Sequence, residues 1–330
     1  MLRVPNPTRA NSKLAALLGG LALAGAHAIA LPASGANTVP QEVGYGQGTI
    51  ETGRSTAVGG ADRALSNSLG ALFMNPANMA SNRVYHIGAL VSVMPEADRQ
   101  TYGAAAVDST TPVAGGLGAT YNKQDPNGLD RVWTDVRFAL AYPFSEQFFM
   151  GVGGRYLWVE QNGLGPLGYS LASGGLPNGK IIRGIGLDAG VTIRPVPELS
   201  LALVGNNIND PGHALQPTTL GGGIGYGADL FTIEADAEAD FSTWQNTEYN
   251  FMGGAGLLLA DNYPVRAGYR FERGPRTHAV SAGIGYVSRF FGVELGVRRL
   301  VAGEEATLVT LDLRYHVEAS GMAGTAMDAY

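Results

Sequence analysis

The 330-residue sequence contains no cysteine, which excludes a lipobox anchor and suits a chain that crosses an oxidising compartment. Charged residues make up only 15% of the chain. Beyond the N-terminus, no segment has the roughly 20 continuous apolar residues that a membrane-spanning helix needs, which argues against a helical membrane protein. The formal net charge of −6 provides no basic face for phosphate groups, so nucleic acid is not expected as a partner.

Glycine is abundant instead, with 48 residues, and together with the low charge it indicates many thin, closely packed strands. From residue 85 onward, segments of about ten residues alternate apolar residues with small or polar ones, and turn residues separate the segments. Period-2 alternation gives a strand two different faces. About ten tilted residues cross the apolar layer of a membrane as a strand but not as a helix.

Fourteen segments follow this alternation, and the clearest covers residues 232–240. They centre near residues 89, 104, 117, 136, 153, 187, 202, 221, 236, 254, 268, 282, 295 and 311. The predicted fold class is therefore all-β. We expect a transmembrane antiparallel β-barrel of about 14 strands, with a small N-terminal plug that contains a short helix.

The connections between these segments sort by parity. If the first strand starts at the periplasmic side, the odd-numbered connections face outside and include the long ones, 122–130, 160–180, 206–217 and 241–248. The even-numbered connections are short. Long external loops and short periplasmic turns are typical of outer-membrane barrels, so the sorting favours an even strand count and an outer-membrane location. Aromatic residues near the strand ends suit interfacial belts, although ordinary strand composition also explains them.

The N-terminus has the features of a secretory signal. A basic region without acidic residues precedes an apolar run from Leu14 to Ala24, and several small-x-small cleavage patterns follow. We therefore expect a signal peptide over residues 1–36, with the cleavage site left open, and a plug over 37–84. The transmembrane barrel is expected over 85–315, followed by a tail over 316–330.

An acidic ladder is the strongest charge feature of the chain. It consists of Glu234, Asp236, Glu238 and Asp240, which share one face of a predicted strand. One interpretation is a site that attracts cations. The interpretation that we favour is a hydrated lumen wall, in which the ladder pairs across strands with Arg266 and Arg270, or with Arg298 and Arg314.

No enzymatic constellation emerges from the sequence. His86 and Ser92, and likewise His278 and Ser281, have spacings that are poor for a Ser–His pair within one strand, which leaves only pairing across strands open. The glycine run at 221–225 lies inside a strand pattern and is not a phosphate loop. We therefore expect neither an enzyme nor a cofactor, and no metal site.

Residues 37–84 break the strand rhythm and carry a recognisable motif. The stretches 53–61, 64–68 and 71–77 read GRSTAVGGA, ALSNS and ALFMNPA, and they precede the first predicted strand. This arrangement resembles the N-terminal hatch of the FadL/PorV-type outer-membrane proteins, in which an Asn-Pro-Ala motif lies ahead of a fourteen-strand barrel. One departure is Asn78, where the family usually has glycine. Asparagine also tolerates the left-handed conformation, so the turn can be retained.

The resemblance implies an outer-membrane barrel for passive uptake of hydrophobic small molecules, such as long-chain fatty acids, through a plugged lumen with an apolar pocket. Asn75, Pro76, Ala77 and Phe73 would then shape the hatch, although Asn75-Pro76 can equally be only a turn before the first strand. The alternative is a PorV-type structural barrel that docks or carries a secreted or surface protein. Outer-membrane lipid and the barrel-assembly machinery are the other expected partners, and Tyr315 or Tyr330 could provide the terminal aromatic for assembly.

Overall fold

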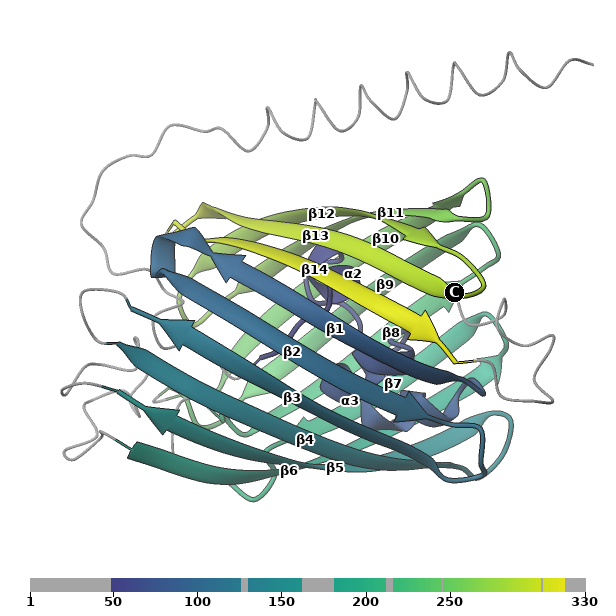
Figure 1. Ribbon diagram of the computed structural model, residues 1–330, viewed down its shortest axis with the longest axis horizontal. Coiled ribbons are helices and arrows are strands. Elements are labelled where there is room, and N and C mark those ends of the chain that lie inside the picture. Colours follow the sequence, from purple (N-terminus) through teal and green to yellow (C-terminus); the bar gives the residue numbers. More distant parts are fainter. Residues whose placement is uncertain are drawn as a thin grey trace, which may run out of the picture. The chain divides into compact units, whose positions relative to one another are not determined.

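The computed structural model describes residues 49–125, 130–161, 181–211, 216–244, 246–303 and 305–317, and within them fourteen strands form a closed barrel (Figure 1). The strands are β1 (Tyr85–Met94), β2 (Arg99–Asp108), β3 (Ala114–Gln124), β4 (Arg131–Pro143), β5 (Phe148–Glu160), β6 (Ile181–Val196), β7 (Leu199–Asn206), β8 (Thr219–Gly227), β9 (Phe231–Asp240), β10 (Glu248–Leu259), β11 (Tyr263–Glu272), β12 (Thr277–Val287), β13 (Phe291–Ala302) and β14 (Thr307–His316). Each strand pairs antiparallel with its sequence neighbours, and β1 pairs with β14 to close the ring. The predicted fourteen-strand antiparallel barrel is confirmed.

The outer wall is apolar because the period-2 pattern turns the larger hydrophobic side chains outward. Leu117, Phe138 and Ile185 are each more than half exposed, whereas polar side chains of the same strands are buried inside. Closing the sheet satisfies the backbone hydrogen bonds that hydrocarbon cannot satisfy. The barrel therefore has the surface of a membrane-spanning outer-membrane protein.

Aromatic rings form a belt at the end of the barrel where the short turns lie. Neighbouring rings contact each other there, with centroids 5.1 Å apart for Tyr142 and Phe144 and 5.4 Å apart for Tyr263 and Tyr286. Amphipathic rings of this kind suit the lipid–water interface.

The connections follow the predicted parity. At the end with the aromatic belt, no connection is longer than the five residues 109–113 that join β2 to β3. The longer connections lie at the other end, which we take as the extracellular end. The expected signal peptide 1–36 lies outside the described residues, as do the first part of the expected plug, most of the 160–180 connection and the tail after residue 317.

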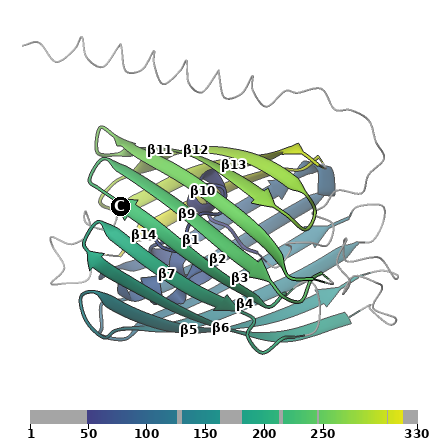
Figure 2. The same ribbon diagram turned by 180° about the vertical axis from the view of Figure 1, so that it is seen from behind.

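The plug lies within the barrel and contains three short helical elements: α2 (Gly53–Ala57), α3 (Ser68–Met74) and the 3₁₀ helix η2 (Pro76–Ala80). Helix α2 packs against β11–β14, α3 packs against β1–β4, and η2 packs against β3–β6. Figure 2 shows the barrel from behind, with the wall from β7 to β11 in front. Among the described residues, no helix is long and apolar enough to cross a membrane.

Candidate functional site

The Asn-Pro-Ala motif joins α3 to η2. Asn75 is the N-cap of η2, and its side-chain oxygen accepts a hydrogen bond from the Ala77 amide at 3.1 Å. Pro76 occupies the first turn, where its missing N–H has no intrahelical partner to lose. The Asn75 amide also donates to the Arg63 carbonyl at 2.8 Å and to the Thr192 hydroxyl at 2.9 Å. The motif thus forms a turn and also connects the plug to the barrel wall.

Asn78 is held by hydrogen bonds and does not adopt the left-handed conformation that we considered. It lies within η2 and is not among the residues with positive φ. Its side-chain amide donates to the Arg63 carbonyl and to the Ser66 hydroxyl, both at 3.0 Å, and its oxygen accepts from Thr192 at 2.6 Å. Asparagine here therefore joins two parts of the plug to β6, which glycine could not do.

Glycines of the inner wall form the seat on which the plug rests. A methyl group at Gly151 of β5 would lie 2.5 Å from the Ala77 nitrogen, and one at Gly268 of β11 would lie 2.5 Å from the Gly59 nitrogen. Neither distance is compatible with a real contact between these atoms, so only glycine lets the plug backbone approach this closely. The abundance of glycine in the strands is explained in part by this plug contact.

Phe73 lies near the end of α3, against β4. The guanidinium carbon of Arg137 lies 5.5 Å from the centre of the Phe73 ring, and Arg137 donates to the Phe73 carbonyl at 3.1 Å. Arg137 also pairs with Asp135 at 3.2 Å. The ring is 7% exposed. Phe73 therefore holds the C-terminal end of α3 against β4, next to the charged side chains of Arg137 and Asp135.

The acidic ladder binds the plug. Glu234 accepts the backbone amides of Ala64 and Leu65, at 2.5 and 3.2 Å. Asp236 accepts the backbone amides of Asp62 and Arg63 at 3.1 Å each, and it also pairs with the Arg63 guanidinium at 3.2 Å.

The last two residues of the ladder, Glu238 and Asp240, have different partners. Glu238 also pairs with the Arg63 guanidinium. Asp240 accepts from the backbone of Thr243 at 2.9 Å and caps the start of the β9–β10 connection. Three of the four carboxylates therefore fix the segment 62–65 to β9.

The expected pairing of the ladder with Arg266 and Arg270 is replaced by other contacts. Arg266 pairs with Glu294 of β13. Arg270 pairs with Glu272 of its own strand at 2.6 Å and lies 3.4 Å from Glu51 of the plug. The reason is that the plug supplies the ladder with a closer cation, Arg63, and with backbone amides, while the two arginines find nearer carboxylates on the wall. Arg270 remains within electrostatic reach of Glu238.

Glu51 is a second anchor of the plug, at the extracellular side of α2. Both of its carboxylate oxygens accept from Arg298 at 2.6 Å, and the side chain is buried. Burial raises the pKa of the Glu51 carboxyl, but attraction to Arg298 and then to Arg270 outweighs this, so the pKa lies below its ordinary value of 4.5. The carboxylate form therefore holds the plug to β11 and β13.

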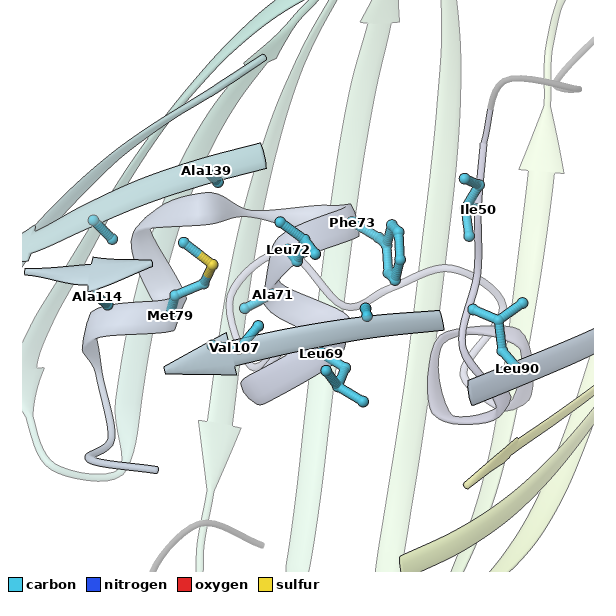
Figure 3. Close-up of a cluster of buried hydrophobic side chains, with 12 residues drawn as sticks. Ile50, Leu69, Ala71, Leu72, Phe73, Met79, Leu90, Val107, Ala114 and Ala139 are labelled. Atoms are coloured by element: carbon cyan, nitrogen blue, oxygen red, sulfur yellow. The ribbon is translucent and has the colours of Figure 1, made fainter. Parts of the chain in front are cut away.

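The other side of the plug is apolar. Figure 3 shows Leu72 and Phe73 on α3, with Met79 of η2 beside Ala114 and Ala139 of the wall. The cluster comprises Ile50, Leu69, Ala71, Leu72, Phe73, Met79, Leu90, Ala105, Val107, Ala114, Ala139 and Ala141. It runs from the middle of the lumen, at Leu90, to the short-turn end, at Ala114 and Ala141. The plug thus has a side rich in hydrogen bonds toward β9–β14 and a mostly apolar side toward β1–β4, where Arg137 donates to the Phe73 carbonyl.

The two larger spaces lined by described residues do not have the expected apolar lining. The larger space of about 710 Å³, which includes its open mouth, is lined mostly by polar side chains. The lining includes Arg63, Arg137, Arg155, Asp188, Glu238, Asp240, Arg270, Asn206, Asn207 and Thr219, with Phe73, Met74 and Pro217 as the apolar residues. A second space of about 530 Å³ surrounds Glu51 and touches Ile50 and Met94. Both spaces are polar vestibules, and each touches the apolar cluster at one residue, Phe73 or Ile50. A smaller space of about 430 Å³ near the short turns of β8–β11 is lined mostly by apolar residues, among them Leu230, Phe231 and Leu257.

The Ser–His combinations that we considered do not come together. Ser92 shares a hydrogen bond of 3.0 Å with Thr310, and His278 contacts the Tyr269 hydroxyl at 2.5 Å on the outer wall. In the part of the chain that the structure describes, no group of three or more His, Asp or Glu side chains is arranged to hold a metal ion.

Sequence reasoning missed four residues that hold the plug: Arg63, Thr192, Gly151 and Gly268. Arg63 is the first residue of a segment, 63–72, that could be helical, and nothing in the sequence identified the partner of its charge. A signal for the glycines was present, because glycine inside a strand often marks close backbone approach, but sequence does not say what approaches.

Comparisons with family models and with curated proteins find no match. Solved structures do match. The toluene transporter TbuX of Ralstonia pickettii superposes with a TM-score of 0.62 at 13% identity, over 82% of this chain and 99% of that chain. The CymD monoaromatic hydrocarbon channel gives 0.63 at 15% identity, over 85% and 99%. The P. putida toluene transporter TodX gives 0.54 at 14% identity, over 84% and 99%.

This likeness confirms the resemblance to FadL-type outer-membrane barrels at the level of the fold. At identities of 13–15% it establishes the arrangement of the strands and does not extend to a ligand.

Proposed function

We propose that this barrel is a passive route through the outer membrane for small hydrophobic molecules, with the plug as its gate. The observation that carries the proposal is the apolar cluster, which extends on one side of the plug from the polar vestibules to the short-turn end. The hydrocarbon channels that share the fold support this ligand class.

The route that we propose follows β1–β4. Its first apolar contacts are Ile50 and Phe73, which border the two vestibules. Leu72 and Met79 then fill the space against the wall, where methyl groups at Gly116 and Gly118 would lie only 3.0 Å from Leu72. Because these side chains make no directional bonds, their displacement costs less than breaking the buried charge contacts on the other side.

The size of the ligand follows from the vestibules. A long alkyl chain that passes a wall of charged groups leaves much apolar surface against polar atoms, whereas a compact molecule leaves little. We therefore favour small apolar compounds over long-chain fatty acids.

Uptake by the full chain in proteoliposomes tests the proposal, with toluene, a long-chain fatty acid and a sugar as probes. We expect toluene to enter faster than in empty vesicles, with the fatty acid slower and the sugar excluded. Leu72→Ala should raise the toluene rate, because it shortens the side chain that fills the route. Leu313→Ala is the matched control, since Leu313 is half exposed on the outer wall.

The second candidate is a plugged structural barrel that docks a secreted or surface protein. The dense polar contacts of the plug and the polar vestibules favour it. If neither the wild-type chain nor Leu72→Ala admits any of the probes, transport is refuted and the structural, protein-docking function is favoured.

A further inference from the structure

A second set of aromatic rings lies on the outer wall toward the extracellular end, on β2, β3 and β5. Tyr102, Tyr121 and Trp158 are between 41% and 49% exposed. Tyr102 pairs with Tyr121 across the strands, and Trp158 pairs with Arg183 of β6. The guanidinium carbon of Arg183 lies 5.0 Å from the centre of the Trp158 ring, and the side chain is exposed. An outward-facing cation therefore borders the apolar wall.

Lys123 of β3 is the second cation of this surface. It follows Tyr121 by two residues, so it faces outward, and it is exposed. Three strand steps of about 4.8 Å and two residues of about 3.3 Å separate it from Arg183, which gives a backbone separation of about 16 Å. Because Arg183 is held over the Trp158 ring, the two charges remain apart. Each cation can therefore meet a different anionic group.

The position of Arg183 along β6 places it at the upper boundary of the apolar wall. Ile193 of the same strand pairs with Phe148, which belongs to the aromatic belt at the short-turn end. The ten residues from Arg183 to Ile193 span about 33 Å along the strand, or about 23 Å along the barrel axis at a tilt of about 45°. The apolar band of outer-membrane barrels is about 25 Å tall. Arg183 is therefore at the level of the outer-leaflet headgroups, and the long Lys123 side chain can extend to the same level.

These two cations differ from Arg299, which also lies on the outer wall. Arg299 pairs with Glu96 of the β1–β2 connection. Among the described residues, no carboxylate forms an ion pair with Lys123 or Arg183. Glu160 of β5 is exposed on the same face and lowers its net charge to +1. The face therefore favours an anionic partner at the membrane surface.

We propose that this basic face, formed by Tyr121, Lys123, Trp158 and Arg183, binds an anionic outer-leaflet glycolipid whose sugar headgroup carries two phosphate groups. Lysine and arginine bind phosphate through charge-assisted hydrogen bonds, and the separation of the two cations suits two phosphates on one broad headgroup. The rings below them suit the boundary between sugar and acyl chains. A zwitterionic phospholipid has a single phosphate and no net charge, so it fits this face poorly. The site lies outside the lumen and does not depend on the proposed uptake.

The test is native mass spectrometry of the full chain in mild detergent, titrated with diphosphoryl lipid A, monophosphoryl lipid A or phosphatidylethanolamine. We expect the diphosphoryl form to bind most tightly. Lys123→Gln or Arg183→Gln should weaken its binding about fivefold each, and the double variant about thirtyfold, because a basic residue near an anionic lipid surface contributes about that factor. Glu160→Gln should strengthen binding. Arg273→Gln is the matched control, since Arg273 is exposed at the same end but lies on another face, 3.5 Å from Glu248.

The comparison of the three lipids uses the wild-type chain alone, so its answer does not depend on the folding of any variant. Equal affinity for the diphosphoryl and monophosphoryl forms, or for phosphatidylethanolamine, overturns the proposal. A double variant that keeps the wild-type affinity overturns it too, as does an equal loss in Arg273→Gln. Failure of toluene uptake leaves this site untouched, because none of its residues lines the lumen.

Discussion

Gly268 offers the sharpest test of how the plug sits in the barrel. A methyl group there would lie 2.2 Å from the Val58 carbonyl carbon and 2.5 Å from the Gly59 nitrogen, whereas ordinary contact begins at 3.4 Å. The plug backbone must therefore retreat by about 1.2 Å, the difference between 3.4 Å and the shortest of these distances. Overpacking of this kind typically costs about 1–3 kcal/mol, and the hydrogen bonds of the neighbouring segment resist the movement. We expect Gly268→Ala to lower the free energy of unfolding by that amount.

Thermal unfolding of the purified chain in detergent, followed by circular dichroism, measures the loss, and trypsin sensitivity of the plug reports its retreat. Gly253→Ala is the matched control, since Gly253 lies on the neighbouring strand and a methyl group there would meet nothing nearer than the Glu234 carbonyl at 3.9 Å. A Gly268→Ala chain that unfolds at the same temperature as Gly253→Ala, with equal protease resistance, refutes the close contact between Gly268 and the plug.

Three further changes test the polar anchors of the plug. Arg63→Leu leaves the Asp236 and Glu238 carboxylates buried without their cation, so unfolding in denaturant should show a loss of about 3–5 kcal/mol, with a smaller loss for Arg63→Lys. Asn78→Ala removes three buried hydrogen bonds and should cost at least about 1–3 kcal/mol in the same assay; a wild-type midpoint would contradict the assigned contacts. The pKa of the Glu51 carboxyl is lower in the folded chain than its ordinary value of 4.5. The stability that this carboxylate contributes is therefore present above pH 4.5 and is lost as the pH falls through the folded-state pKa. This loss should be absent when the unfolding temperature of Glu51→Gln is measured against pH.

The wall of the barrel could be predicted from sequence because its rule is local. Inner and outer faces alternate residue by residue, so a segment such as 232–240 carries its own signal of a two-faced strand. The connections added a second, independent signal, because their lengths alternate with the direction of the chain. Both signals can be read from the sequence without knowledge of any long-range contact.

The plug could not be predicted in the same way, because its contacts depend on residues far apart in the chain. The partner of Glu234 is the backbone of Ala64, 170 residues earlier, and no pattern in either segment identifies the other. The expected partners of the ladder were arginines on nearby strands, the reasonable choice for a hydrated lumen. Only the position of the plug shows that its segment 62–65 provides the closer partners.

The two sides of the plug should differ in how easily they move. Toward β9, the plug is held by directional contacts to buried charges, each costly to break. Toward β1–β4, it is held by apolar packing, which yields in small steps. Because the chain has no native cysteine, single cysteines can report this difference. Leu72 and Ala64 are both buried, at 5% and 0% exposure, on the apolar and the polar side. We expect an apolar maleimide to label Leu72→Cys faster than Ala64→Cys, and equal or reversed rates would contradict a route along β1–β4.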